Sequence, residues 1–117
     1  MTSKEMAKIA ASALDEKKGV DLRIIDISEV SIMTDYFIVV SGNSDRQVQA
    51  LADSVQEELG KVDVFPRNVE GYHGANWILL DFNDVVVHIF DQENRAFYDI
   101  ERIWRDGTWI SANEFLP

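Results

Sequence analysis

Cysteine is absent from this sequence, and so are long apolar runs. Without cysteine the chain has no disulfide framework, no cysteine-ligated zinc and no thiol nucleophile, a composition that suits the reducing cytoplasm. Runs such as Ile78 to Leu80 and Val85 to Val87 have the length of strands and fall far short of the roughly 20 residues that span a bilayer. The start, Met1 to Lys8, leads into no apolar signal core. We therefore expect a cytoplasmic protein with no membrane contact.

Basic residues are also scarce. The chain has 11 Lys and Arg against 21 Asp and Glu, which gives a net charge of -10. Nucleic-acid backbones are bound by clusters of basic side chains that displace counterions, whereas this surface on average repels phosphate. We expect little direct nucleic-acid binding, and a basic protein partner fits better. Acidity that only keeps a small protein soluble is the alternative.

The length of 117 residues is close to the commonest size of a single domain, so we expect one domain over residues 1–117. Thr2 and Glu5 have the spacing of a helix capping box. Apolar residues from Met6 to Leu14 follow at helical spacing, and Gly19 is typical of a helix end. A first helix is predicted between Thr2 and Gly19.

A second helix is predicted over Asp45 to Leu59, where apolar residues form a stripe. The preceding Ser41-Gly42-Asn43-Ser44 segment has the composition of a turn, and Ser44 can cap the helix with Gln47 reaching back. A phosphate site at this loop is the alternative, because free backbone donors and the helix dipole favour anions. The segment has one glycine, no lysine and neither nucleotide-loop pattern, so we favour the cap.

Two strands are predicted between these helices, over Asp21 to Ile27 and Tyr36 to Val40, from their β-branched and aromatic residues. The connection from Ser28 to Asp35 is polar but contains apolar side chains that suggest packing against something, namely Val30, Ile32 and Met33. Further on, Val62 to Val69 contains Pro66, which lacks a ladder donor and points to an edge or irregular strand.

A β-hairpin is the clearest local prediction, with strands Trp77 to Phe82 and Val85 to Phe90 around the turn Asn83-Asp84. This register pairs Phe82 with Val85, Leu80 with Val87, Leu79 with His88 and Trp77 with Phe90. One hairpin face is then apolar and is assigned to the core: Ile78, Leu80, Phe82, Val85, Val87 and Ile89. The other face carries two ionisable groups among apolar side chains: Trp77, Leu79, Asp81, Val86, His88 and Phe90.

A last helix is predicted with Asp91 as its cap, before Asp106-Gly107 turns the chain into a short tail. Its apolar residues at helical spacing are Phe97, Ile100 and Trp104. The order of elements predicts an α/β (α+β) fold with a single mixed sheet of about five strands flanked by helices.

Asp81 and His88 are the main candidates for chemistry, since the register makes them diagonal neighbours about 7–8 Å apart. A carboxylate beside an imidazole can orient a base or bind a metal, with Ser41 or Ser44 as conceivable nucleophiles, but no hydrolase pattern is present. We favour a half-buried histidine satisfied by a carboxylate. His73 lies in a glycine-flanked loop without a second histidine or a cysteine nearby, so no metal or cofactor is expected.

Trp77 lies with Leu79 and Phe90 on the charged hairpin face. It can belong to a second core under a covering helix, or it can anchor an interface, where aromatic residues are enriched. The sequence leaves these two alternatives open.

Together these motifs resemble the ribosomal silencing factor (Iojap-like) family along nearly the whole chain. The matching residues are Thr34-Asp35-Tyr36-Phe37, Ser41 to Ser44, Arg46-Gln47-Val48, Trp77 to Asp81, Asp84 to Phe90, Arg95, Phe97-Tyr98, Glu101 and Trp104. Asn83 stands where relatives often have glycine, and asparagine also tolerates the left-handed turn.

The resemblance implies a translational repressor that binds the large ribosomal subunit through ribosomal protein L-fourteen and blocks joining of the small subunit when nutrients are short. It implies a nucleotidyltransferase-like fold without that activity, and relatives occur as homodimers. Paired acidic metal ligands are missing, because Asp53 lies within the second helix without a partner. The expected partner-binding residues are Trp77, Leu79, Asp81, His88 and Tyr98. A nucleotidyltransferase-like nucleotide-binding protein and a dimeric scaffold are the alternatives.

Overall fold

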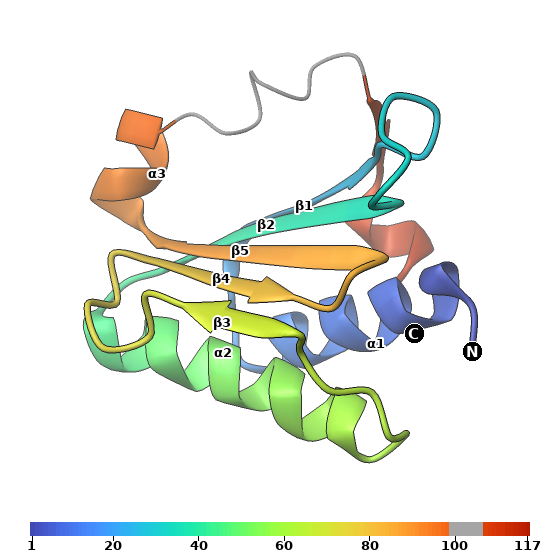
Figure 1. Cartoon of the computed structure of the whole chain (residues 1–117). Coiled ribbons are helices and arrows are strands. Elements are labelled where there is room, and N and C mark those ends of the chain that lie inside the picture. Colours follow the sequence, from blue (N-terminus) through green and yellow to red (C-terminus); the bar gives the residue numbers. More distant parts are fainter. Residues whose placement is uncertain (99–106) are drawn as a thin grey trace.

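The computed structural model describes the backbone of residues 1–98 and 107–117 and the side chains of 1–95 and 107–117. One sheet separates two helical layers (Figure 1). Helices α1 (Ser3–Glu16) and α2 (Asp45–Gly60) cover one face, and the short α3 (Gln92–Tyr98) lies over the other. A 3-10 turn, η1 (Ala112–Glu114), follows the last strand. The predicted α+β fold class is confirmed.

The sheet has six strands in the order β3-β4-β5-β2-β1-β6. Their bounds are Val20–Asp26 (β1), Tyr36–Gly42 (β2), Asn68–Glu70 (β3), Trp77–Asp81 (β4), Val85–Asp91 (β5) and Thr108–Ile110 (β6). Strands β2 and β5 run parallel in the centre, whereas the outer pairs are antiparallel. Helix α2 supplies the long crossover that parallel neighbours require.

The main core lies between the sheet and the helices α1 and α2. Thr2 caps α1 by accepting a hydrogen bond from the Glu5 N–H at 3.1 Å, as the spacing predicts. The helix end differs from the prediction, because Lys18 and not Gly19 adopts the left-handed conformation, with φ 61°. The side chains of α1 and α2 that face the sheet are fully buried, among them Leu14, Leu51 and Val55.

The predicted hairpin is confirmed in its register. Leu79 pairs with His88, Leu80 with Val87 and Trp77 with Phe90. The Phe82 N–H donates to the Val85 carbonyl at 2.9 Å, and Asn83 has φ 74°, so the two-residue turn is also where the sequence placed it. The six residues assigned to the core face all lie in the main core.

Two predictions about the rest of the sheet need correction. The expected short tail contains a sixth strand, because β6 pairs with β1 through Ile110 opposite Ile24. Three residues are too few to show a period of two, so only pairing reveals such a strand. The connection from Ser28 to Asp35 does not pack as expected, because its apolar side chains Val30, Ile32 and Met33 are exposed.

Strand β3 is the outermost strand on its side and begins two residues after Pro66. The predicted edge strand is therefore present, though shorter than Val62 to Val69. None of the described helices has the length and apolar character needed to cross a membrane.

Candidate functional site

The side chains on the α3 side of β4 and β5 form what we call the hairpin face, made up of Trp77, Leu79, Asp81, Val86, His88 and Phe90. Strand β2 continues this face, since Phe37 pairs with Val86 and Val39 with His88. Trp77, Leu79 and Asp81 are half-buried, whereas His88 and Phe90 are buried. The face therefore changes from a buried centre to an accessible side along β4.

Trp77 and His88 form a hydrogen-bonded aromatic pair. The Trp77 indole Nε1–H donates to His88 Nδ1 at 3.1 Å, and the Trp77 ring stacks on Phe90 with centroids 5.2 Å apart. Phe37 contacts the imidazole edge-on at 4.8 Å. The predicted partner of His88, a carboxylate, is wrong. The indole took that position because Trp77 is long enough to reach the diagonal neighbour on its own face.

Burial lowers the pKa of His88 to about 4, because the 3% exposed imidazole cannot keep a hydrated charge. The side chain is then neutral near pH 7. Since Nδ1 accepts from the indole, the ring proton is on Nε2, and Nε2 has no hydrogen-bond partner among the described residues. His88 is thus a poor general base and a structural support for Trp77.

Asp81 pairs with a cation that sequence reasoning missed. Arg67, just before β3, donates from Nη2 to Asp81 Oδ2 at 2.8 Å, and the Asn83 N–H donates to Oδ1 at 2.8 Å. Burial raises the pKa of Asp81, but these two hydrogen bonds and the Arg67 charge outweigh it and leave the pKa below its usual value. Asp81 is therefore ionised and organises the hairpin turn.

Leu79 lies beside a hollow at the β3 edge of the sheet. The hollow has a volume of about 250 Å³ and is lined by Glu70, Gly71, Trp77 and Leu79. Gly71 has φ 79°, and a Cβ added there would come within 2.1 Å of the Trp77 carbonyl oxygen. Only glycine permits this close approach, which brings the loop against the start of β4.

Helix α3 follows β5 directly and is held at the β5 side of the hairpin face. Asp91 caps it as predicted, accepting from the Asn94 N–H at 2.7 Å. The buried Arg95 donates to the Asp21 carbonyl at 2.6 Å and to Ser41 Oγ at 3.1 Å. Tyr98 is the last described residue of this helix, but its side chain lies outside what the structure describes, as do Ile100 and Trp104, so their predicted roles stay predictions.

The Ser41 to Ser44 segment is occupied by contacts within the chain. Ser44 Oγ accepts from the Gln47 N–H at 3.1 Å, and Gln47 Oε1 accepts from the Asn43 N–H at 2.6 Å. Two of the backbone donors that a phosphate could use, those of Asn43 and Gln47, are thereby bonded within the chain. This geometry supports the interpretation as a helix cap.

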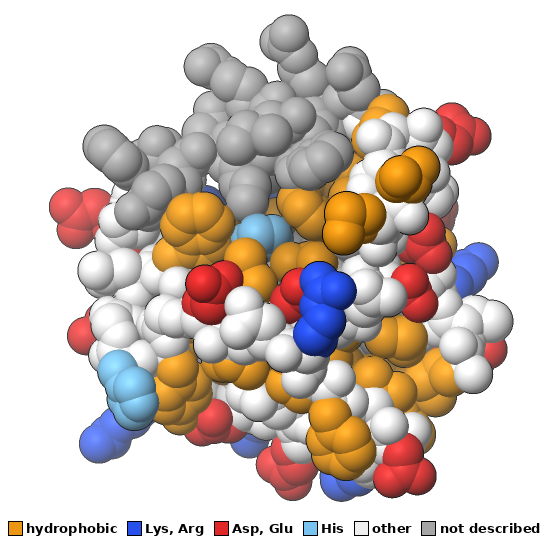
Figure 2. Space-filling model, viewed as in Figure 1, with side chains coloured by type: hydrophobic (Ala, Val, Ile, Leu, Met, Phe, Trp, Pro, Cys, Tyr) orange, Lys and Arg blue, Asp and Glu red, His pale blue; other side chains and the backbone are white. Residues whose placement is uncertain are grey.

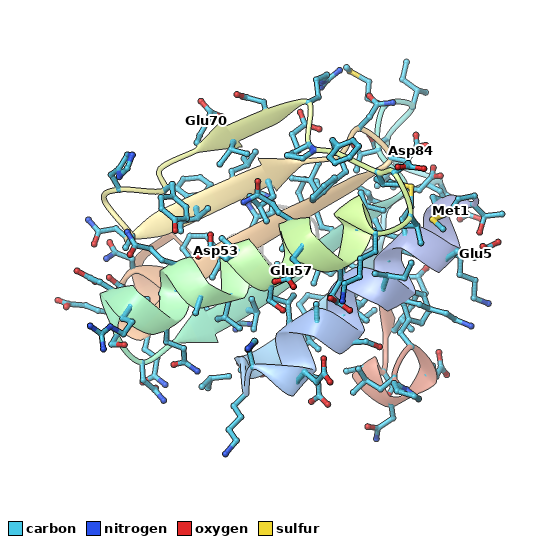
Figure 3. All side chains as sticks on the ribbon, turned by 90° about the horizontal axis from the view of Figure 1, so that it is seen from below. Met1, Glu5, Asp53, Glu57, Glu70 and Asp84 are labelled. Carbon is cyan, nitrogen blue, oxygen red and sulfur yellow. The ribbon has the colours of Figure 1, made fainter. Side chains whose placement is uncertain are left out.

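Acidic side chains elsewhere do not converge on one site. Asp53 lies on α2 and accepts from the Tyr72 hydroxyl at 3.0 Å, and Figure 3 shows it apart from Glu5 and Glu70. No three His, Asp or Glu side chains within the described part of the chain are close enough to hold a metal ion.

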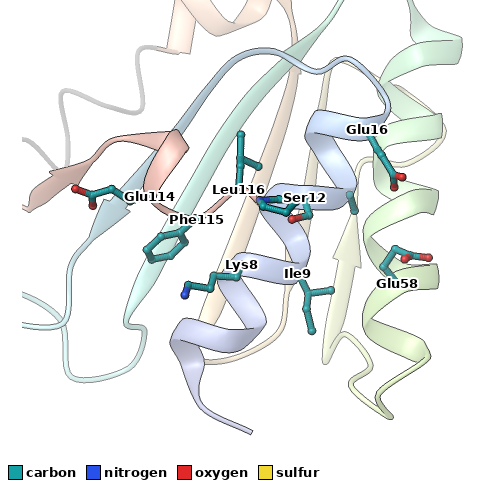
Figure 4. A pocket seen from close by; sticks show the side chains of 10 residues that line it. Lys8, Ile9, Ser12, Glu16, Glu58, Glu114, Phe115 and Leu116 are labelled. Atoms are coloured by element: carbon teal, nitrogen blue, oxygen red, sulfur yellow. The ribbon is translucent and has the colours of Figure 1, made fainter.

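A second hollow of about 400 Å³ lies on the helical side, between α1 and the C-terminal segment (Figure 4). Lys8, Ile9 and Ser12 of α1 line it together with Glu58 of α2 and Leu116. Its four charged side chains, Lys8 and Glu16 of α1, Glu58 of α2 and Glu114 of η1, make no ion pair with one another that the structure records. It lies away from the hairpin face and adds nothing to that site.

The hairpin face suits recognition better than catalysis. It combines a tryptophan held by a hydrogen bond, an accessible leucine and an ionised carboxylate, and among the side chains that the structure describes no hydrogen bond joins a nucleophile to the buried imidazole. Arg67, Arg95 and Gly71 were missed as contributors, because their contacts join segments far apart in the sequence. Of these three, only Arg95 was among the residues that carried the family resemblance.

A model of the family described as "Ribosomal silencing factor during starvation" matches residues 1–116. Ribosomal silencing factor RsfS of Bacillus subtilis is 39% identical over 107 residues, which cover 92% of this chain and 91% of that protein. The chloroplastic protein Iojap of Zea mays is 35% identical over 101 residues, which cover 86% of this chain and 43% of that protein.

Solved structures agree with this result. A crystal structure of a Chromobacterium violaceum protein is 40% identical with a TM-score of 0.86, covering 89% of this chain and 87% of that one. A crystal structure from Bacillus halodurans is 33% identical with a TM-score of 0.82, covering 92% of this chain and 97% of that one. Sequence, fold and the family model agree over nearly the whole length, and this chain belongs to the ribosomal silencing factor family.

Proposed function

We propose that this protein binds the large ribosomal subunit through ribosomal protein L-fourteen and blocks joining of the small subunit, lowering translation when nutrients are short. The observation that carries the proposal is the hairpin face: Trp77 and Leu79 lie half-exposed beside the ionised Asp81 on a chain of net charge -10. Such a face complements a basic protein that itself lies on RNA. The action is steric and needs no catalytic group.

Within this proposal the predicted contact residues have different roles. Leu79 and Asp81 touch the partner, with Arg67 holding the Asp81 carboxylate at 2.8 Å. Trp77 provides an aromatic surface at the hollow beside Gly71. The buried His88 fixes the orientation of the indole ring by accepting its N–H hydrogen bond. A locked aromatic side chain loses little conformational entropy on binding, which favours affinity. Tyr98 remains a predicted helper from the end of α3.

The test is sucrose-gradient sedimentation of purified large and small subunits, with and without the protein, at a magnesium concentration that favours association. The expected result is co-sedimentation with the large subunit and loss of joined ribosomes. If joining is unaffected and the protein stays at the top of the gradient, the proposal is wrong.

Two matched variants assign the effect to the hairpin face. Asp81→Lys should abolish co-sedimentation, because it places a cation against a basic partner. Glu57→Lys makes the same charge change on the exposed side of α2 and should bind like the unchanged protein. Equal loss in both variants would mean that net charge, and not this face, governs binding.

A further inference from the structure

The connection between β1 and β2 exposes an unusual group of apolar side chains. Val30, Ile32 and Met33 are 47%, 105% and 66% exposed, and we call residues 27–35 the apolar loop. Single exposed hydrophobic residues are ordinary on protein surfaces, but three within four residues form a patch that needs a reason. Figure 2 shows hydrophobic side chains gathered at the upper right, where Figure 1 places this loop.

The backbone of the loop is well held, so the exposure is not that of a loose tip. The Ile27 N–H donates to the Asp35 carbonyl at 2.8 Å, and the Ser31 N–H donates to the Ile27 carbonyl at 2.8 Å. Ser31 Oγ in turn accepts from the N–H groups of Met33 and Thr34 at 3.2 and 3.3 Å. These bonds close the loop on itself and direct its apolar side chains outward, an arrangement that lowers the entropy lost on binding.

The loop is also joined to the hairpin turn. Thr34 Oγ1 donates to the Asn83 carbonyl at 3.0 Å, and the Asp35 N–H donates to the Asp84 carbonyl at 2.8 Å. Asn83 is the residue whose N–H is held by Asp81. The apolar loop and the charged end of the hairpin face are therefore parts of one continuous surface.

The charge around the loop indicates which kind of partner can bind there. No Lys, Arg or His occurs between Arg23 and Arg46, whereas Asp26, Glu29 and Asp35 lie within or beside the loop. Arg67 lies at the adjoining hairpin turn, where its charge is paired with Asp81. An acidic rim repels an anionic lipid surface. It also makes a second copy of a chain with net charge -10 a poorer occupant of this loop than a basic protein. It attracts a basic protein that offers an apolar depression.

We propose that the apolar loop is a second contact with the basic large-subunit protein that the hairpin face binds, with Ile32 and Met33 buried in an apolar depression and Glu29 in its basic rim. This inference rests on the proposed function and names the part of the chain that extends its interface. The loop and Asp81 lie at the same end of the β4–β5 hairpin, the end with the turn, so a partner that contacts Asp81 can also reach the loop.

The experiment measures binding of fluorescently labelled protein to purified large subunits by titration. The variant I32S/M33S should bind at least about tenfold more weakly, since buried apolar anchors carry much of the affinity of an interface. The control is F65S, because Phe65 is 67% exposed but lies beside the end of α2, on the side of the sheet that α1 and α2 cover (Figure 1). F65S should bind like the unchanged protein.

The outcomes separate the two proposals. If the unchanged protein does not bind large subunits, the proposed function fails. If it binds and I32S/M33S binds within about twofold of it, only the loop contact is wrong. Thermal unfolding checks that the variant is folded, and Ile32→Ser alone, at a side chain fully in solvent, gives the same comparison if the double variant unfolds.

Two further measurements test other occupants of the loop. Sedimentation velocity would overturn the proposal if I32S/M33S turned a dimer into a monomer while large-subunit affinity stayed unchanged. Binding of the unchanged protein to vesicles of phosphatidylcholine and phosphatidylglycerol, lost in the variant, would overturn it in favour of lipid. Glu29→Lys should weaken large-subunit binding, more so at low salt, as attraction to a basic rim requires.

Discussion

The two faces of the central hairpin differ in what they bury. The face toward α1 and α2 carries only apolar side chains, and Ile78, Leu80 and Ile89 are fully buried there. The face toward α3 mixes aromatic rings with Asp81 and His88 and leaves part of β4 accessible. The first face has one task, which is to form the core. The second face both packs against α3 and presents a surface to solvent, and this explains its polar groups.

Neighbouring leucines on β4 provide the strongest test of this difference. Leu80→Ala should lower the free energy of unfolding by about 2–5 kcal/mol, because it leaves a cavity in the main core. Leu79→Ala, one residue earlier and half-exposed, should cost about 1 kcal/mol or less but weaken large-subunit binding. Urea denaturation measures the free energy of unfolding of each variant, and the binding titration measures its affinity for large subunits. Similar stability losses in the two variants would show that the faces are not distinct.

Gly71 sharpens the comparison at the accessible side of the face. Gly71→Ala should destabilise the protein by about 3 kcal/mol, because the residue has a positive φ and its Cβ would collide with the Trp77 carbonyl. The measurement is the midpoint of thermal unfolding. Gly74→Ala is the control, since its Cβ would meet only ordinary contacts and its φ is not positive.

Because His88 is buried, we expect the free energy of unfolding to depend on pH, an effect to which the all-apolar face makes no contribution. Between pH 6.5 and about 4, His88 binds a proton in the unfolded chain but not in the folded chain. The free energy of unfolding therefore falls as the pH falls through this window. The loss amounts to about 3 kcal/mol at most. Urea denaturation at several pH values should show it. His88→Phe should flatten the curve in this range, and an unchanged slope would contradict the buried neutral imidazole.

The Asp81–Arg67 pair should give the smallest change in stability. Arg67→Gln should cost less than about 1 kcal/mol, because exposed ion pairs are screened by solvent. Its larger effect should be on binding, since Asp81 then loses the group that orients it. Differential scanning calorimetry measures the change in stability, and co-sedimentation measures the change in large-subunit binding. A large loss of stability would show that this pair belongs to the fold and not to the interface.

Much of the fold followed from local patterns. The hairpin register, the caps Thr2, Ser44 and Asp91, and the two long helices were all predicted and confirmed, because periodicity and capping act within a few residues. The accessible residues Trp77, Leu79 and Asp81 were predicted on one face for the same reason. Their role in binding stays a proposal.

By itself, the sequence determined the elements, the two unlike hairpin faces, the acidic charge and the family resemblance, because these depend on spacing and composition. Only the tertiary structure decided that β6 joins the sheet, that Arg67 and not His88 pairs with Asp81, and that the apolar loop stays in solvent. Each depends on which distant segments meet in space. A local pattern carries no information about such meetings, because they are settled by the packing of the whole chain.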